Sequence, residues 1–256
     1  MPLSPEIRGR GNAGPAVLFL HGLGSSSADW AFQLPAFETR HRLILTDLAG
    51  HGRAAGSPGR ATVEAMAADV DGLLAALGEP AVHVVGLSLG GCVGLALALA
   101  APARVRSLTL VNVFARLRPA GPRSALRMLT RLVLLGTAPM AVVAAHVARG
   151  LFPRPEQRDL YRMAVASLSR TRRGAYLAAV RALARFDARD RLGAIRCPTL
   201  VVAGAEDRTV PLAAKELLGR AIPGARLVVV EDSGHATPFD QPAAFNRAVL
   251  AFVEAH

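Results

Sequence analysis

The chain has 256 residues, of which 52% are hydrophobic and only 5% aromatic, so aliphatic side chains must supply most of its core. This length suits one large domain with a single sizeable core. Its two cysteines, Cys92 and Cys197, are too far apart for a metal-binding spacing or a disulfide framework, and we expect both to be small core fillers.

The formal net charge of +11 is concentrated in one segment. Residues 115–191 contain sixteen arginines and four acidic residues, whereas the rest of the chain is nearly neutral. Few aromatic side chains are interleaved with these arginines, so the composition disfavours nucleic-acid binding. The N-terminus has Pro2, Pro5 and Glu6 where a basic and then apolar leader would be, and the apolar stretch 132–145 is too short for a bilayer. The sequence therefore predicts a cytoplasmic protein with no signal peptide and no transmembrane segment.

Short apolar segments alternate with helical segments, as in a parallel sheet that is covered on both faces. Thr62 is predicted to cap the second helix, because its hydroxyl can accept from a free amide in the first turn. Before residue 17 there is room for one or two short strands at most. The predicted buried strands are 17–20, 43–45, 82–85, 108–111, 200–202 and 227–230, and the predicted helices are 28–37, 62–77, 91–100, 211–220 and 242–255.

The alternation stops between residues 115 and 187, where helical periodicity and turn residues replace the strands. Such a stretch is too long for a structureless loop. We therefore predict an α/β core domain formed by residues 1–114 and 188–256. Residues 115–187 are predicted to form an all-helical cap over the C-terminal edge of the sheet.

The segment Gly86-Leu87-Ser88-Leu89-Gly90 lies between a predicted strand and a predicted helix. A strand, a sharp turn and a helix are the context in which a G-x-S-x-G sequence marks a nucleophilic serine. The turn strains the backbone of the serine and holds its hydroxyl clear of the sheet. Glycine-flanked serines also occur in ordinary loops, so the prediction that Ser88 is a nucleophile depends on finding its partners.

A nucleophilic serine needs a base, and the base needs a third group to orient it. Asp207 and His235 each follow a predicted strand. Taken singly, the first is equally suited to capping a helix and the second to a structural role. The order serine, acid, histidine along the chain favours a catalytic triad. Of the competing residues, Glu206 should face the other way, Asp232 is too close in sequence to the histidine, and Asn112 lacks the charge.

The segment His21-Gly22-Leu23-Gly24 directly follows the first predicted buried strand. Acyl transfer requires hydrogen-bond donors aimed at the oxygen that becomes negative in the tetrahedral state. We expect the backbone amides of Leu23 and Leu89 to form this oxyanion hole. His21 is expected to brace the loop by hydrogen bonding rather than to transfer a proton.

Taken jointly, the motifs resemble those of the α/β-hydrolase fold family over nearly the whole chain. Within that family the chain is most similar to the small capped serine esterases, including 3-oxoadipate enol-lactone hydrolases. The resemblance implies a mostly parallel sheet flanked by helices, with a helical cap between the sixth and seventh of the usual eight strands. Ala54 departs from the pattern, since relatives often have serine there, but this touches no catalytic residue. The motifs are His21-Gly22-Leu23-Gly24, Asp47-Leu48-Ala49-Gly50-His51-Gly52-Arg53, Gly86-Leu87-Ser88-Leu89-Gly90-Gly91, Gly204-Ala205-Glu206-Asp207 and Ser233-Gly234-His235.

These observations predict an enzyme that hydrolyses an ester-type bond in a small molecule through an acyl-serine intermediate, as a carboxylesterase does, with no metal or cofactor. One alternative is a lactonase or thioesterase whose anionic substrate is steered by the arginines. A solvated arginine-rich surface explains the same charge without a ligand. Another alternative is a scaffold with a hydrolase fold that docks on a membrane or a protein. The apolar positions 132–143 suit either an acyl pocket or the core of the cap.

Overall fold

The computed structural model describes residues 3, 5–9, 11, 14–57, 59–119 and 121–256. The described residues form a seven-stranded sheet in the order β1-β3-β2-β4-β5-β6-β7. The edge strand β1 (Pro5–Arg8) is antiparallel to its neighbour, and the other pairs are parallel. The parallel strands are β2 (Val17–Leu20), β3 (Leu43–Thr46), β4 (Val82–Leu87), β5 (Val105–Val111), β6 (Thr199–Gly204) and β7 (Arg226–Val230). The predicted α/β class is confirmed.

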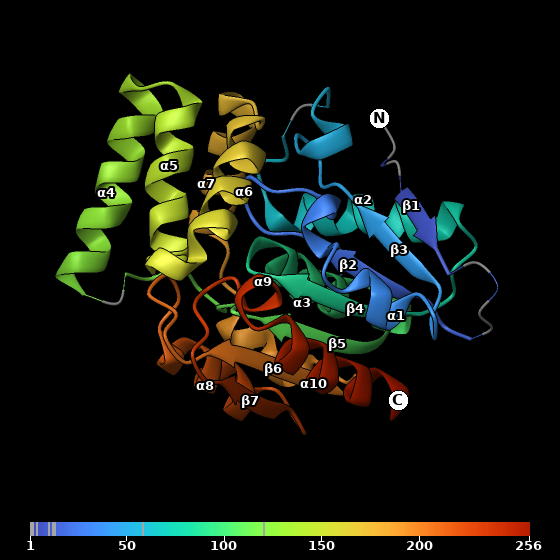
Figure 1. Cartoon of the computed structure of the whole chain (residues 1–256). Helices are drawn as coiled ribbons and strands as arrows, with labels where there is room; N and C mark the ends of the chain where they lie inside the picture. The colour runs from blue at the N-terminus through green and yellow to red at the C-terminus, as the bar shows by residue number, and fades with distance from the viewer. Residues whose placement is uncertain (1–2, 4, 10, 12–13, 58, 120) are drawn as a thin grey trace.

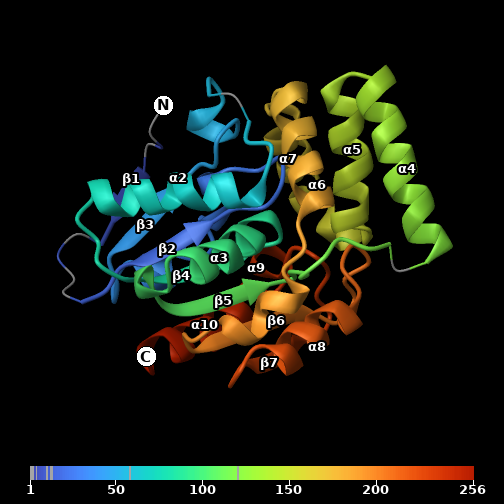
Figure 2. The ribbon, with the colours of Figure 1, turned by 180° about the vertical axis from the view of Figure 1, so that it is seen from behind.

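Helices cover both faces of the sheet, and successive strand side chains point alternately into the two layers. In β2, Leu18 and Leu20 pack on the face covered by α2 (Val63–Ala76), α3 (Leu89–Ala100) and α8 (Leu212–Ala221). Val17 and Phe19 pack against α1 (Leu34–Phe37) and α10 (Pro242–Glu254) on the opposite face. Figures 1 and 2 show these two layers from opposite sides. The short helices are η1 (Ser27–Trp30), η2 (Gly52–Ala54), η3 (Pro102–Arg104), η5 (Arg189–Ala194) and α9 (Thr237–Asp240).

The predicted helical insertion leaves the sheet after β5 and returns at β6. It contains α4 (Pro122–Thr137), α5 (Met140–Leu151), η4 (Pro155–Gln157), α6 (Arg158–Ser169) and α7 (Arg173–Arg185). These helices stand beside the sheet, with α4 outermost (Figure 1). The two ends of the insertion meet in a bridge between Arg116 and Asp187, beside a hydrogen bond of 2.9 Å from the Ala188 N–H to the Ala115 carbonyl. We propose this bridge as the boundary between the core, residues 1–114 and 188–256, and the cap, residues 115–187.

Two local predictions are wrong. The helix expected at 28–37 is divided into η1 and α1, because the ring of Pro35 is incompatible with a continuous helix through the preceding turn. The strand predicted at 227–230 is not fully buried. Within the described sheet, β7 pairs with β6 alone and forms the edge, so Leu227 and Val229 are more than a third exposed.

Two other local predictions, the helix cap and the core position of the cysteines, are confirmed. The Thr62 hydroxyl accepts from the Ala65 N–H at 3.2 Å and so caps α2. Cys92 is buried and Cys197 is half-buried, and both are free thiols. In the described part of the chain, no helix has the length and apolar character needed to cross a membrane.

Candidate active site

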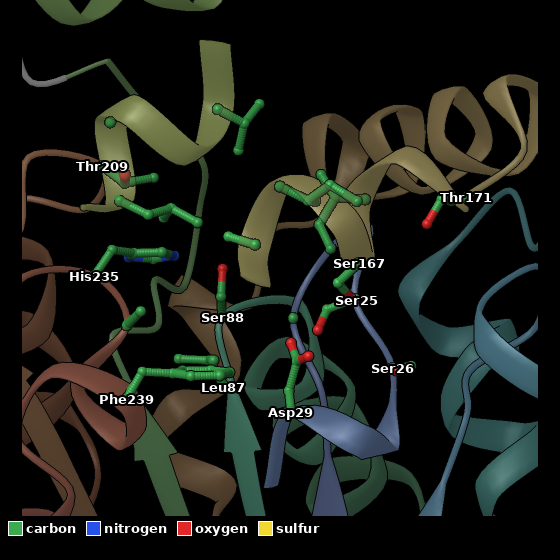
Figure 3. A pocket seen from close by; sticks show the side chains of 18 of the residues that line it. Ser25, Ser26, Asp29, Leu87, Ser88, Ser167, Thr171, Thr209, His235 and Phe239 are labelled. Carbon is green, nitrogen blue, oxygen red and sulfur yellow. The ribbon is translucent and has the colours of Figure 1, made fainter. Parts of the chain in front are cut away.

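Ser88 lies at the sharp turn between β4 and α3 (Figure 3). Its backbone has φ 52° and ψ −109°, a conformation that is strained for a residue with a side chain. A Cβ atom at Gly86 would lie 2.5 Å from the carbonyl oxygen of Gly90, and one at Gly90 would overlap the carbonyl oxygen of Leu20. The turn therefore requires both glycines, as the sequence pattern predicts.

His235 and Asp207 are hydrogen-bonded, with 2.8 Å between Nδ1 and Oδ2. Burial alone would raise the pKa of Asp207, but the charges and hydrogen bonds of His235 and Lys215 lower it to about 2. The carboxylate is thus ionised at neutral pH and can only accept hydrogen bonds. It follows that Nδ1 of the neutral imidazole carries the proton and Nε2 is left as a proton acceptor.

Ser88 and His235 line one cavity of about 860 Å³ between the strand ends and the cap. Figure 3 shows the Ser88 hydroxyl rising into this cavity with the His235 ring projecting toward it from one side. The structure therefore places the three predicted triad residues at one edge of the sheet. Their catalytic roles stay predictions.

Asn112 fixes the loop that carries His235. Its backbone φ is 51°, and its Nδ2 donates to the carbonyl of His235 at 2.8 Å and to the hydroxyl of Thr237 at 2.8 Å. Its Oδ1 accepts from the Gly204 N–H at 2.8 Å, at the end of β6. Asn112 lacks the charge expected of a triad acid, and its amide instead joins the loop of His235 to the end of β6.

Two charged groups beside the triad were not predicted, the fully buried Lys215 and the half-buried Asp240. Nζ of Lys215 lies 2.9 Å from Oδ2 of Asp207, and the Asp240 carboxylate accepts from the Gly234 N–H at 2.6 Å. Lys215 precedes the core residue Leu218 by three positions on α8, so it lies on the buried face of that helix. A lysine on an apolar helix face was the signal available in the sequence.

The competing carboxylates have other partners. Glu206 forms an ion pair with Arg154, with 2.5 Å between Oε2 and Nη2, and Asp232 lies 3.9 Å from the same guanidinium. Asp207 is the carboxylate that bonds the His235 ring, as predicted.

The loop after β2 forms the wall of the cavity near Ser88. Gly22 and Leu23 line the cavity, and Leu89 is the first residue of α3, where backbone N–H groups have no acceptor within the helix. His21 donates from Nδ1 to the Gly22 carbonyl at 2.8 Å and accepts at Nε2 from the Leu48 N–H at 3.0 Å. Burial lowers the pKa of His21 to about 4, so this histidine is a neutral brace, as expected.

The walls of the cavity differ in polarity. Leu132 lines the cavity, whereas Leu135 and Val143 pack inside the cap, so the segment 132–143 contributes both to the cavity wall and to the core of the cap. Ser25, Asp29 and Ser167 lie together on the far side of Ser88 from His235 (Figure 3). Burial raises the pKa of Asp29 to about 7, the charge of Asp47 adds to this rise, and a hydrogen bond with Ser167 opposes it.

Arg131 is a cationic group in the cavity wall. Its guanidinium lies over the Tyr176 ring, 4.9 Å from the centroid, and donates to the Tyr176 hydroxyl. Its buried Nε has no hydrogen-bond partner among the described residues. As for metals, the residues that the structure describes contain no group of three or more His, Cys, Asp or Glu side chains placed to hold an ion.

Comparison with known proteins places this chain in a family. The model of the α/β hydrolase fold family matches residues 15–242. The chain belongs to the α/β-hydrolase fold family. This is a family of hydrolytic enzymes, and the match confirms the predicted fold and the resemblance on which it was based.

Relatives of this α/β hydrolase are named for different activities. A relative from Azorhizobium caulinodans, named "Putative carbamate hydrolase RutD", is 36% identical over 96% of this chain and 93% of its own length. A solved hydrolase from Pseudomonas aeruginosa is 33% identical with a TM-score of 0.87, covering 98% of this chain and 93% of its own. The enol-lactonase from Burkholderia xenovorans is 28% identical with a TM-score of 0.89, over 98% and 96% of the two chains. The ester-specific part of the prediction therefore stays a prediction.

Proposed function

We propose that this α/β hydrolase is a serine hydrolase that cleaves the ester bond of a small molecule through an acyl-Ser88 intermediate. The observation that supports it best is the hydrogen bond of 2.8 Å from His235 to Asp207 beside a strained serine in the same cavity. A structural protein gains nothing from a strained residue that faces a cavity, whereas a nucleophile requires that exposure.

In the proposed reaction, Nε2 of His235 accepts the Ser88 proton while Oγ forms a bond to the ester carbonyl carbon. Asp207 holds the imidazole and stabilises its charged form. The backbone N–H groups of Leu23 and Leu89 stabilise the oxyanion, each lowering the barrier by about 3 kcal/mol. Nε2 then gives its proton to the leaving alcohol as the carbon–oxygen bond breaks. A water molecule, deprotonated by His235, releases the acid from Ser88.

The cavity favours an ester with a sizeable acyl or alcohol group. A volume of about 860 Å³ corresponds to pockets that hold drug-sized ligands, and much of the cap wall is apolar. A carbamate of only a few atoms would leave most of this space empty. We therefore favour a carboxylesterase over the activity in the names of the RutD relatives.

A second candidate is a lactonase or thioesterase that acts on an anionic substrate. Arg131 supports it, because a guanidinium in a cavity wall suits a carboxylate or phosphate. The test compares neutral esters with esters of equal size that end in a carboxylate. For this candidate, the anionic esters lose kcat/KM selectively in Arg131→Gln and as salt rises, while equal salt dependence of both series contradicts it.

The serine mechanism is tested with Ser88→Ala and the neighbouring Ser25→Ala as a matched control. The assay uses p-nitrophenyl esters of increasing acyl length together with a p-nitrophenyl carbamate. We expect Ser88→Ala to lose kcat by about a thousandfold or more, while Ser25→Ala keeps it within about tenfold. A fluorophosphonate should label Ser88 in the wild type and in Ser25→Ala, and it should leave Ser88→Ala unlabelled. An active, unlabelled enzyme with Ala at position 88 contradicts the mechanism, and faster turnover of the carbamate than of every ester contradicts the carboxylesterase assignment.

A further inference from the structure

The only lysine of the chain is fully buried behind the candidate triad. Lys215 is on α8, and neither its side chain nor that of Asp207 has exposed surface. Its Nζ lies 2.9 Å from Oδ2 of Asp207 and donates to the Gly204 carbonyl at 3.3 Å. An ammonium ion is costly to bury, so its position next to a catalytic carboxylate requires an explanation.

Each carboxylate oxygen of Asp207 has two hydrogen-bonding partners. Its Oδ1 accepts from the backbone N–H groups of Thr209 at 2.7 Å and Val210 at 3.0 Å. Its Oδ2 is shared by the Lys215 ammonium and the His235 ring, at 2.9 and 2.8 Å. The two backbone donors already fix the orientation of the carboxylate, so the lysine adds mainly a positive charge.

We propose that Lys215 is a positioning residue that neutralises Asp207 and thereby keeps the His235 imidazole in its neutral, proton-accepting form at neutral pH. This inference deepens the proposed function and rests on the same triad. Without the lysine, the lone carboxylate would attract a proton onto His235 and remove the base. With Lys215 present, protonation of the His235 ring would place a second cation beside Oδ2 of Asp207, which already contacts the Lys215 ammonium.

The size of the effect follows from the shared oxygen. Two cations that both bond Oδ2 lie within about 6 Å of each other, and at the effective dielectric constant of protein interiors such a pair shifts a titration by about one to two pH units. Burial lowers the pKa of Lys215 below its usual value, and the charge and hydrogen bond of Asp207 oppose this lowering.

The other charged groups around His235 are the same in every Lys215 variant and form a constant background. Asp240 lies beneath the loop through its bond to Gly234, and Arg127 donates to the carbonyl of Arg208. Asp240, Asp232 and the ion pair of Arg154 with Glu206 lie at or next to the loop of His235. The cavity that the ring lines also contains Arg127, Arg131, His146, Arg208 and, on the far side of Ser88, Asp29.

The kinetic test is the pH dependence of kcat/KM for a neutral p-nitrophenyl ester in three proteins. In Lys215→Met, which removes the charge from a side chain of similar length, the acidic limb should move up by about one to two pH units. Below the limb, activity should then fall by about tenfold for each pH unit of this movement, and it should recover at high pH to within a few-fold of the wild type. Lys215→Arg keeps the charge and should keep the limb. A lowered plateau with an unmoved limb means a merely structural lysine and overturns the proposal.

A second measurement needs no enzymatic activity and no substitution of Lys215. Because the chain has one lysine, ¹³C-lysine labelling of Ser88→Ala gives a single Cε signal, assigned without ambiguity. This signal should show a step at the pH at which the His235 ring signal titrates, and His235→Asn should abolish it. Absence of the step overturns the inference. A coupled titration in Ser88→Ala together with a wild type that has no esterase activity would instead refute the proposed function and leave the contact between the two charges intact.

Discussion

The two walls of the cavity are built differently. At the strand ends, charged groups have short buried contacts, and Ser88, Asn112 and Asp232 are held at positive φ. On the cap, Arg173 donates to the backbone carbonyls of Leu135 and Ala138, and Arg127 to that of Arg208. The outer face of α4 leaves the side chains of Leu126, Leu129 and Val133 more than half exposed. Under the proposed function, the strand ends hold the reacting atoms in place and the cap wall selects the substrate.

A glycine-to-alanine substitution should have its largest effect at Gly90, in the elbow that carries Ser88. Gly90→Ala should lower the free energy of unfolding by about 3 kcal/mol, because the new methyl group overlaps the Leu20 carbonyl on β2 and neither backbone can yield. It should also remove most esterase activity, since α3 must move away from the loop that carries Leu23. Denaturant unfolding and kcat measure the two effects. A variant with wild-type stability would mean that the elbow is not packed as described.

The strand-end wall was predictable because its information is local. The glycines around Ser88, and the placement of Asp207 and His235 after strands, are short patterns with one geometric solution on a parallel sheet. Lys215 was not predicted, because its contact joins α8 to the end of β6 and depends on the tertiary packing of both. Pro35 was the signal in the sequence that residues 28–37 do not form one continuous helix, because its ring is incompatible with a helix through the preceding turn.

The cap was predictable only in outline. Helical periodicity shows that residues 115–187 are helical, but the pairing of α4 to α7 depends on long-range packing that periodicity does not encode. The edge position of β7 is a similar case, since an apolar strand reads as buried until its neighbours are known. Local patterns therefore predict the chemistry better than the substrate.

Asp29, on the polar side of the cavity, should lower the stability of the folded protein at neutral and higher pH. Its folded-state pKa of about 7 lies above the ordinary value of 3.8, so between these values the folded state holds a proton that the unfolded state has lost. Stability from this group is therefore present at low pH and lost as pH rises from about 4 to about 7. Asp29→Asn, neutral throughout, should gain up to about 4 kcal/mol at pH 8 and nothing below about pH 4. A gain that is independent of pH would contradict this titration.

The cap counterpart of Gly90 is Gly136, near the end of α4. A Cβ atom there meets nothing within 4 Å, and this residue does not line the cavity. Gly136→Ala should therefore raise the free energy of unfolding by about 0.5 kcal/mol through helix propensity alone and leave kcat unchanged. Denaturant unfolding followed by circular dichroism measures the gain. If α4 unfolds separately from the sheet, the global midpoint stays fixed and only hydrogen exchange within α4 slows, which would show that the cap is a separate cooperative unit. A loss of stability would mean that this helix is packed as tightly as the core and that the contrast between the two walls is wrong.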